Sequence, residues 1–409
     1  MNIPMRLFVP LLIVFSLLTV SCGDGTDEPR YPIPAQADRT VLVYMSAEND
    51  LSGTYSQADL IEMRKGSKSM GRNNNLIVYV DESNSRVKPY LLRIVNGETA
   101  DSIPYSSDRL ASDPQTLRNV LQKVISRYPA KEYALGLWGH ASGWLIESDS
   151  VAVEQPAAAR RRAYGRDTGD NSFSSSYGTW LNIPTMASVL SSLPVRLKYI
   201  FCDCCNMMSV ETAYELRDVT EYLIGSPAEI PGYGAPYETV VPAMMKKNDF
   251  AEAIVDSYYA HYNGTGKDVA LSVIRTEGEG LTRLAEVTRE VLYNAFHDQT
   301  GYPGIYGLIY YLDKNMIDMN DLMLRFASAD DYDRWKDALK EVVVYKKMAT
   351  QWRTNGHVYF SDFTVTEERY GGISIFVPQK PGNNDYAQYN EDIRKMGWYY
   401  AAGYSDIGW

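Results

Sequence analysis

Hydrophobic residues along this chain form two alternating patterns, which predict strands and helices in turn. Short apolar runs bounded by turn residues are typical of buried parallel strands, and five occur at 40–45, 75–81, 133–138, 197–201 and 222–226. Segments with helical spacing separate them, at 53–68, 113–128, 184–192 and 210–217. The alternation predicts an α/β fold whose mostly parallel central sheet is covered by helices on both faces, with Tyr90–Val95 as an edge strand.

The pattern changes after about residue 264. A strand is predicted at 268–275 and a long helix at 279–295, and further helical segments follow through the 310s and at 331–345. A late strand at 371–377 precedes an aromatic-rich tail. We therefore expect a core at 40–263 and a C-terminal α+β subdomain at 264–409.

Two of the predicted strands end in reactive side chains. One leads to Gly139-His140, and another leads to a cluster that holds Cys202, Cys204 and Cys205. In open α/β sheets the chemistry lies at the carboxyl ends of the strands, so an imidazole and a thiol are predicted at the same edge. This pair is the minimal set of groups for covalent acyl transfer.

The N-terminus has the features of an export signal. Arg6 precedes an apolar stretch at 7–20, which at ~14 residues is too short to span a membrane and fits a secretory signal. Cys22 follows it and begins a polar, acidic run that resembles a lipoprotein signal of the Bacteroidetes type. We expect a signal peptide at 1–21, lipidation of Cys22, a linker at 22–39 and an outer-membrane or cell-surface location, with a periplasm-facing anchor as the other orientation. The alternative is a plain signal peptide with an incidental cysteine.

Composition excludes several classes of protein. The net charge of -11 argues against a nucleic-acid partner, and 45% apolar residues are ordinary for a globular chain. Besides Cys22, the three cysteines lie within four positions, so a disulfide framework is not expected and at least one thiol should be free. These cysteines are two residues and one residue apart, which is too close for a tetrahedral zinc site without distant ligands. No metal site is predicted.

The segment 146–177 interrupts the pattern with a loop composition. It contains Arg160, Arg161 and Arg162 and a run rich in Gly, Asp and Ser. A basic run of this kind is either a solvated loop or a site of proteolytic processing.

Several blocks of the chain resemble the clostripain family of cysteine peptidases, relatives of caspases and gingipains. The blocks are Thr40–Leu51, Trp138–Trp144, Asp203–Met207, Gly225–Tyr237 and Gly371–Pro378, in the family's order. The resemblance implies a caspase-like α/β/α sandwich and a cysteine endopeptidase that acts on proteins or peptides. It also implies that Cys205 is the nucleophile and His140 the base and proton donor.

The resemblance extends to the groups around the nucleophile. It implies that the backbone amides of Cys205 and Ala141 bind the oxyanion, with Ala141 standing where the family usually has glycine. The N-terminus of the helix predicted from Val210 would favour the thiolate.

Substrate preference follows from the same resemblance. Asp203 matches a family acid that binds a basic side chain, whereas Tyr233 replaces a second acid and Glu229 lies near enough to compensate. We expect cleavage after Arg or Lys and self-processing at Arg160, Arg161 or Arg162. No cofactor is required in this interpretation. The resemblance leaves a calcium requirement open, and the sequence has no EF-hand-type loop.

Two other functions compete with this one. A catalytically silent member of the fold would bind peptides or glycans at the surface, and a thiol–disulfide or metal-handling protein would use the cysteine cluster. The leading hypothesis is an exported lipoprotein peptidase that acts as a monomer, with contact to the membrane only through its lipid.

Overall fold

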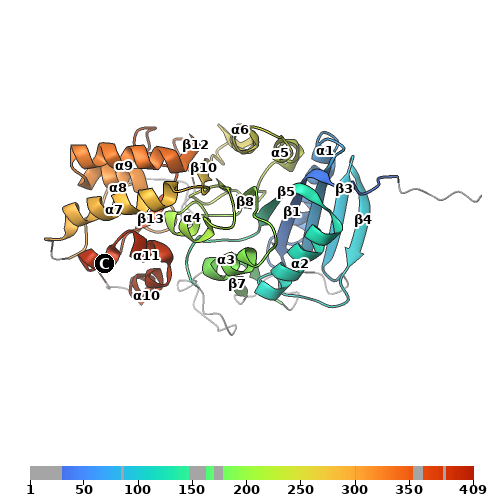
Figure 1. Ribbon diagram of the computed structural model, residues 1–409, viewed down its shortest axis with the longest axis horizontal. Coiled ribbons are helices and arrows are strands. Elements are labelled where there is room, and N and C mark those ends of the chain that lie inside the picture. The colour runs from blue at the N-terminus through green and yellow to red at the C-terminus, as the bar shows by residue number, and fades with distance from the viewer. Residues whose placement is uncertain are drawn as a thin grey trace, which may run out of the picture. The chain divides into compact units, whose positions relative to one another are not determined.

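A nine-stranded sheet runs through the computed structural model, which describes residues 30–83, 87–146, 163–169, 178–299, 301–352, 363–380 and 384–409 (Figure 1). The chain from Ile33 to Trp409 forms one compact unit. The strand order is β12 (Val343–Met348), β10 (Ala270–Arg275), β9 (Tyr222–Gly225), β8 (Tyr199–Asp203), β5 (Ala130–Trp138), β1 (Ala37–Ala47), β2 (Asn74–Glu82), β3 (Tyr90–Val95) and β4 (Glu98–Pro104).

The centre of this sheet is parallel and its margins are antiparallel. Strands β9, β8, β5, β1 and β2 pair in parallel, while β10 and β12 on one side and β3 and β4 on the other run antiparallel. The parallel strands are buried almost throughout, as their uninterrupted apolar runs predicted. The predicted mostly parallel α/β sheet is confirmed.

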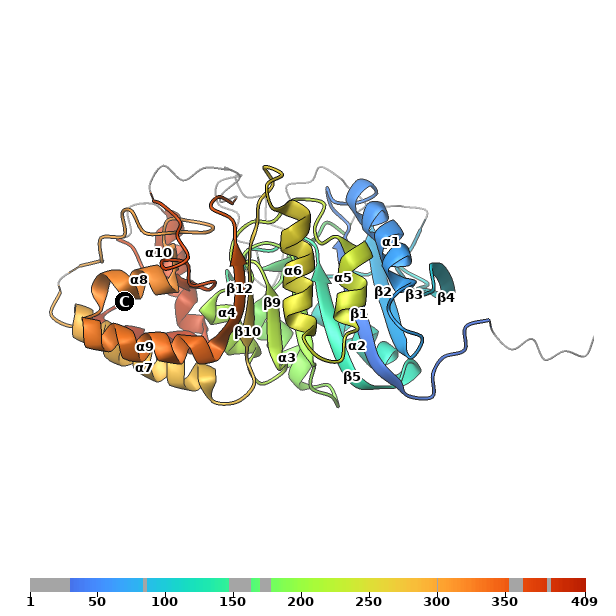
Figure 2. The same cartoon turned by 90° about the horizontal axis from the view of Figure 1, so that it is seen from above.

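Helices cover the sheet on both faces, which gives the three layers of an α/β/α sandwich (Figures 1 and 2). One face carries α1 (Thr54–Ser67), α5 (Tyr237–Met244) and α6 (Phe250–Tyr262). The other carries α2 (Pro114–Arg127), α3 (Ile183–Ser191) and α4 (Val210–Leu216). Helix α2 begins as predicted, because the Asp113 side chain accepts a hydrogen bond from the Gln115 amide at 3.0 Å and a proline occupies the first turn.

The C-terminal part adds helices beyond strand β12. Helix α7 (Gly280–Phe296) packs on α9 (Ala329–Val342), and α8 (Met319–Phe326) lies beside α9. The remaining elements are α10 (Asn384–Asp392), α11 (Gly397–Ala401) and two short 3₁₀ turns, Ile393–Lys395 and Tyr404–Ile407. Two small antiparallel pairs complete the fold, β11 (Met316–Asp318) with β13 (Ser374–Phe376) and β6 (Tyr164–Asp167) with β7 (Thr179–Leu181).

Three local predictions were wrong. Tyr90–Val95 is not an edge strand, because β4 continues the sheet beyond it with a polar, half-exposed sequence that ends in proline. The segment through the 310s contains strand β11, and helix α8 begins only at Met319. The helix predicted to reach Tyr345 ends at Val342, where β-branched valines enter strand β12.

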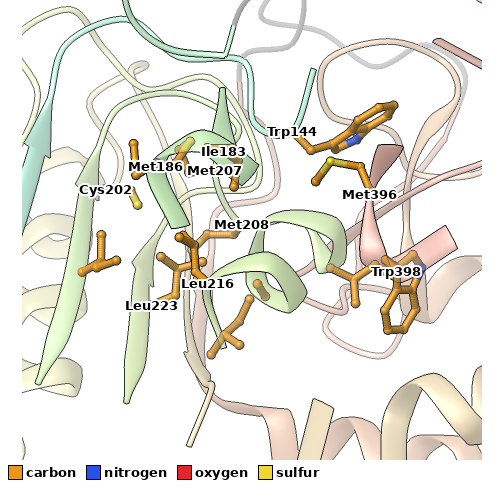
Figure 3. Packing of buried hydrophobic residues seen from close by; sticks show 14 of the residues in the cluster. Trp144, Ile183, Met186, Cys202, Met207, Met208, Leu216, Leu223, Met396 and Trp398 are labelled. Atoms are coloured by element: carbon orange, nitrogen blue, oxygen red, sulfur yellow. The ribbon is translucent and has the colours of Figure 1, made fainter. Parts of the chain in front are cut away.

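Strands β10 and β12 continue the central sheet across the predicted boundary at residues 263 and 264. The division into a core at 40–263 and a C-terminal subdomain at 264–409 therefore stays a prediction. A single hydrophobic cluster joins both parts, and Figure 3 shows Met208, Leu216 and Leu223 packed in the same cluster as Met396 and Trp398 near the C-terminus. No helix in the described ranges is both long and apolar enough to cross a membrane.

Candidate active site

The register of two adjacent strands brings the predicted reactive residues to one edge. Strands β5 and β8 pair in parallel with Trp138 opposite Asp203, the last residue of each strand. His140 and Cys205 each lie two residues further along, on neighbouring loops. The Gly139 amide donates to the Asp203 carbonyl at 3.4 Å, so the pairing continues into the loops themselves.

The two loops are also in direct contact, and a glycine makes this possible. Gly143 has a φ of 68°, and a Cβ added there would lie 2.5 Å from the Asn206 carbonyl oxygen. Asn206 has a φ of 59°, the left-handed conformation that asparagine tolerates better than most residues. Both loops therefore have tightly specified backbones where they meet.

An aromatic residue anchors the histidine loop to the C-terminal part of the chain. Trp144 is buried in the hydrophobic cluster shown in Figure 3. Its ring lies edge-on to that of Phe376 in β13, with 5.1 Å between the ring centroids. The amide of Ser374, also in β13, donates to the Met208 carbonyl at 3.0 Å. The C-terminal elements thus support both reactive loops.

His140 is held by an acid that lies just after strand β1. Its Nε2 lies 3.0 Å from Asp50 Oδ1, and the Arg166 guanidinium lies 3.1 Å from the same oxygen. The hydrogen bond with His140 is the largest cause that lowers the pKa of Asp50 to about 2, and Arg166 adds to it. Asp50 is therefore an anion over the whole range in which an imidazole titrates, and it orients His140.

Among the three cysteines at this edge, only Cys205 is partly accessible. Cys202 and Cys204 are buried, and burial raises the pKa of the Cys204 thiol. The Ile230 amide donates to Cys205 Sγ at 3.4 Å. Cys205 is therefore the one of these three thiols that combines partial exposure with this backbone hydrogen bond.

Helix α4 follows the Cys205 loop after four intervening residues. It begins at Val210, and the Ser209 side chain caps it by accepting a hydrogen bond from the Thr212 amide at 3.1 Å. Asn206–Ser209 separate this end from Cys205. The Ile230 amide, on the loop after β9, is a donor to the sulfur.

Ala141, the predicted oxyanion residue that replaces a glycine, has an ordinary backbone. It forms a β-bridge with Tyr164 and is absent from the described non-glycine residues with positive φ. An alanine therefore occupies this position without backbone strain. The bridge also attaches the histidine loop to strand β6, because the Gly165 amide donates to the His140 carbonyl at 2.8 Å.

Asp203 lies beneath the glycine-rich loop that follows β9. Its carboxylate accepts hydrogen bonds from the Ala235 amide at 2.8 Å, the Tyr237 hydroxyl at 2.9 Å and the Tyr258 hydroxyl at 3.2 Å. Gly234 has a φ of 59°, and a Cβ there would lie 2.7 Å from Asp203 Oδ2. Burial raises the pKa of Asp203, with the three donors acting in the opposite direction.

A second acid faces Asp203 from helix α1. Asp59 is 2% exposed and accepts a hydrogen bond from Trp138 Nε1 at 2.6 Å. Burial, followed by the charge of Asp203, raises the pKa of Asp59, and the half-buried Glu62 acts in the same direction on both. Three carboxyl groups therefore gather behind the nucleophile strand, where a cationic side chain would be stabilised.

The other predicted site residues lie further out. Tyr233 is 49% exposed, and its ring contacts Tyr55 and lies beneath the Lys267 ammonium. Glu229 is half-buried and directly precedes Ile230. The residues predicted for lipidation and processing, Cys22 and Arg160, Arg161 and Arg162, lie outside the described residues.

The sequence analysis did not predict several residues of the site. Asp50 stood in the quoted block Thr40–Leu51, but nothing in its spacing links it to a histidine ninety residues away. Arg166 lies in a segment whose composition is that of a loop, so its contact with Asp50 could not be expected. The role of Asp59 depends on how helix α1 packs over Trp138, which the sequence does not give. The Ile230 amide is a backbone group and carries no side-chain signal.

An accessible cysteine and an oriented histidine, at the carboxyl edge of a parallel sheet in an α/β/α sandwich, define a cysteine peptidase with the caspase-like fold. The family model of the clostripain family matches residues 43–409, so the chain belongs to that family. Its substrates are therefore proteins or peptides.

Solved structures of similar proteins agree with this assignment. A secreted C11 cysteine protease from Bacteroides thetaiotaomicron, in complex with an irreversible peptide inhibitor, is 28% identical with a TM-score of 0.71, over 91% of this chain and 100% of that one. An inactive zymogen C11 protease from Parabacteroides distasonis is also 28% identical, with a TM-score of 0.70, over 91% and 99%. No curated protein sequence matches the chain.

Proposed function

We propose that this chain is an endopeptidase in which Cys205 and His140 act as a catalytic dyad and Asp50 orients the histidine. The observation that carries the proposal is the pairing of Trp138 with Asp203, which places both loops at one edge. The partial exposure of Cys205, in contrast to the buried Cys202 and Cys204, supports the choice of nucleophile.

The proposed reaction has two steps. The Cys205 thiolate attacks the carbonyl carbon of the scissile bond, and the resulting oxyanion accepts hydrogen bonds from the amides of Cys205 and Ala141. The C–N bond breaks as His140 gives a proton to the leaving amine, which leaves a thioester on Cys205. His140 then takes a proton from water, whose oxygen attacks the thioester and releases the acid and the thiolate.

We further propose a preference for Arg or Lys before the scissile bond. The family's second acid is absent at Tyr233, but Asp59 and Glu62 on helix α1 place two further carboxyl groups near Asp203. Burial raises the pKa of Asp59 and Asp203, so part of the attraction to an entering guanidinium or ammonium group goes into ionising them. The gathered carboxyl groups support an acidic pocket for a basic side chain, built from α1 and β8, with Glu229 and Tyr233 at its margin.

The proposal also includes self-processing and export of the protein as a lipoprotein. Self-processing at Arg160, Arg161 or Arg162 fits a basic preference, and the Parabacteroides distasonis relative is an inactive zymogen. Export as a lipoprotein anchored at Cys22 fits the secreted relative from Bacteroides thetaiotaomicron.

Active-site labelling tests the dyad and the preference together. The purified protein is incubated with an acyloxymethyl ketone probe that carries Arg, and the adduct is mapped by mass spectrometry. We expect one adduct on Cys205, which is lost in His140→Ala and retained in the matched variant Cys204→Ala. A probe with Leu in place of Arg should label at least about 10-fold more slowly, a difference of about 1.4 kcal/mol.

Other outcomes would count against the proposal. Adducts on Cys204 would exclude the assigned nucleophile, and equal labelling by both probes would exclude the basic pocket. A thiol that reacts with iodoacetamide but with neither probe would favour the catalytically silent binding protein.

A further inference from the structure

An open hollow lies on the surface of helix α7, in the C-terminal part of the chain. It has a volume of about 350 Å³ and is lined by Arg289, Glu290, Tyr293 and Asn294 of that helix and by Asp406 of the last 3₁₀ turn. Helices α7 and α9 run side by side in this part of the molecule (Figure 2). None of the five lining residues belongs to the loops of the candidate active site.

Tyr293 gives the hollow an aromatic surface that is held in place. Its side chain is 47% exposed, and the ring of His297, one turn further along α7, stacks against it with 4.5 Å between the ring centroids. His297 Nδ1 donates to the Tyr293 carbonyl at 2.6 Å, which fixes the stacked pair. The tyrosine therefore offers a ligand a partly open ring in a defined orientation.

The charged side chains around this ring are paired within the protein. Arg289 Nη2 lies 2.7 Å from Asp406 Oδ2, and Arg334 of α9 lies 3.0 Å from Glu290 Oε2. The turn that carries Asp406 packs closely on α7, because a Cβ added at Gly403 would lie 2.5 Å from Arg289 Cγ. Since each charge is balanced by a partner, the hollow offers little attraction to a strongly ionic ligand.

The same side chains retain much of their capacity for hydrogen bonds. A guanidinium group carries five N–H donors and a carboxylate about four acceptor positions, so one ion pair uses only part of either. Asn294 Nδ2 donates to Asp331 of α9 at 3.2 Å, which fixes the plane of an amide that has both donors and an acceptor. Hydroxyl groups, which donate and accept at once, match such a mixed set of partners.

We propose that this hollow binds a neutral saccharide. A sugar ring has an apolar face of C–H groups, which would lie on Tyr293, and a rim of hydroxyls, which would bind Arg289, Asn294 and Asp406. Small-molecule sites have volumes of about 300–1,000 Å³, so the hollow has the size of a site for a small saccharide. Sugar binding here does not rest on the proposed peptidase activity.

Titration calorimetry with simple sugars tests the proposal. The full chain with Cys205→Ala, which prevents self-digestion, is titrated with maltose, cellobiose and lactose, and with digalacturonic acid as an anionic probe. We expect at least one neutral disaccharide to bind with a Kd of about 1 mM or tighter, and digalacturonic acid to bind more weakly. Tyr293→Ala should weaken this binding at least about 10-fold, whereas Tyr293→Phe, which keeps the ring, should change it less than about 3-fold. Tyr306→Ala, at an 80% exposed tyrosine outside the hollow, should leave it unchanged.

The possible results separate clearly. No saturable binding of any of the neutral sugars up to about 10 mM overturns the proposal, and so does binding that survives Tyr293→Ala unchanged. Binding of digalacturonic acid alone excludes a neutral ligand. The Tm of each variant shows whether it is folded, and if Tyr293→Ala does not fold, the exposed Asn294→Ala decides in its place. A chain that binds sugar but hydrolyses no peptide would contradict the proposed function and leave this site.

Discussion

A buried glutamate next to the nucleophile loop should make the stability of this protein depend on pH. Glu211, in the first turn of helix α4, is 0% exposed. Its Oε1 accepts a hydrogen bond from the Phe376 amide at 2.8 Å, while its Oε2 is buried without a hydrogen-bond partner among the described residues. Burial raises the pKa of Glu211 from 4.5 to about 7.

The sign and size of the effect follow from linkage. Between pH 4.5 and about 7 the folded state holds a proton on Glu211 that the unfolded state releases, so the free energy of unfolding falls as the pH rises through this window. The difference between a pKa of 4.5 and one of about 7, at about 1.36 kcal/mol for each pH unit, gives a loss of about 3 kcal/mol by pH 8. Glu211→Gln keeps a carbonyl acceptor for the Phe376 amide but cannot ionise. Its free energy of unfolding therefore does not fall in this way as the pH rises.

Urea unfolding at several pH values measures the difference. The Cys205→Ala protein serves as the parent. The free energy of unfolding of Glu211→Gln minus that of the parent should rise by about 2.5 kcal/mol from pH 5 to pH 8. Other titrating groups cancel in this difference. Glu277→Gln, on an exposed residue, controls for the loss of a surface carboxylate. A difference between Glu211→Gln and the parent that does not change with pH would refute the reasoning.

Three further variants test the site. Asp50→Asn should lower kcat on the order of 10-fold or more with little change in KM, because it removes the anion that orients His140; an unchanged kcat in a peptide assay would exclude that role. Gly143→Ala should cost about 1–3 kcal/mol of stability in urea unfolding and reduce activity, since its Cβ would lie 2.5 Å from the Asn206 oxygen; wild-type stability would contradict the close contact. Asp203→Asn should lower kcat/KM for Arg substrates at least about 10-fold more than for Leu substrates, and an equal loss on both would point to a purely structural acid.

The parts of the fold that the sequence predicted are those governed by a strong local signal. The strand ending at Trp138 and the strand ending at Asp203 are buried on both faces, so their apolar runs stand out from their neighbours. Strand β4 was missed because an edge strand need not be apolar, and its sequence reads as a loop. Helices α5 and α6 received no prediction, although α6 packs against strand β10 and helps to enclose Asp203 through Tyr258.

Of the candidate site, the sequence predicted the residues that directly follow buried strands. His140 and Cys205 follow buried strands in adjacent positions, so topology alone brings their loops together. Asp50 also follows a strand, but its role depends on where a loop turns after β1, and no periodicity encodes that turn. Asp59 lies on a helix, and its meeting with Asp203 depends on how α1 packs across the sheet. The residues that were missed are therefore those whose position depends on a loop turn or on helix packing.

Two buried acidic groups lie at this edge of the sheet, and burial raises carboxyl pKa values in each. Burial raises the pKa of Asp203 and of Asp59, and the charge of Asp203 adds to the effect on Asp59. Burial and the neighbouring carboxylates also raise the pKa of Asp81. In our proposal the basic side chain of a substrate lies against the first group during a catalytic cycle and favours its ionised form. Acidification should therefore weaken the binding of an Arg substrate, because it places protons on the carboxylates that face the substrate's side chain.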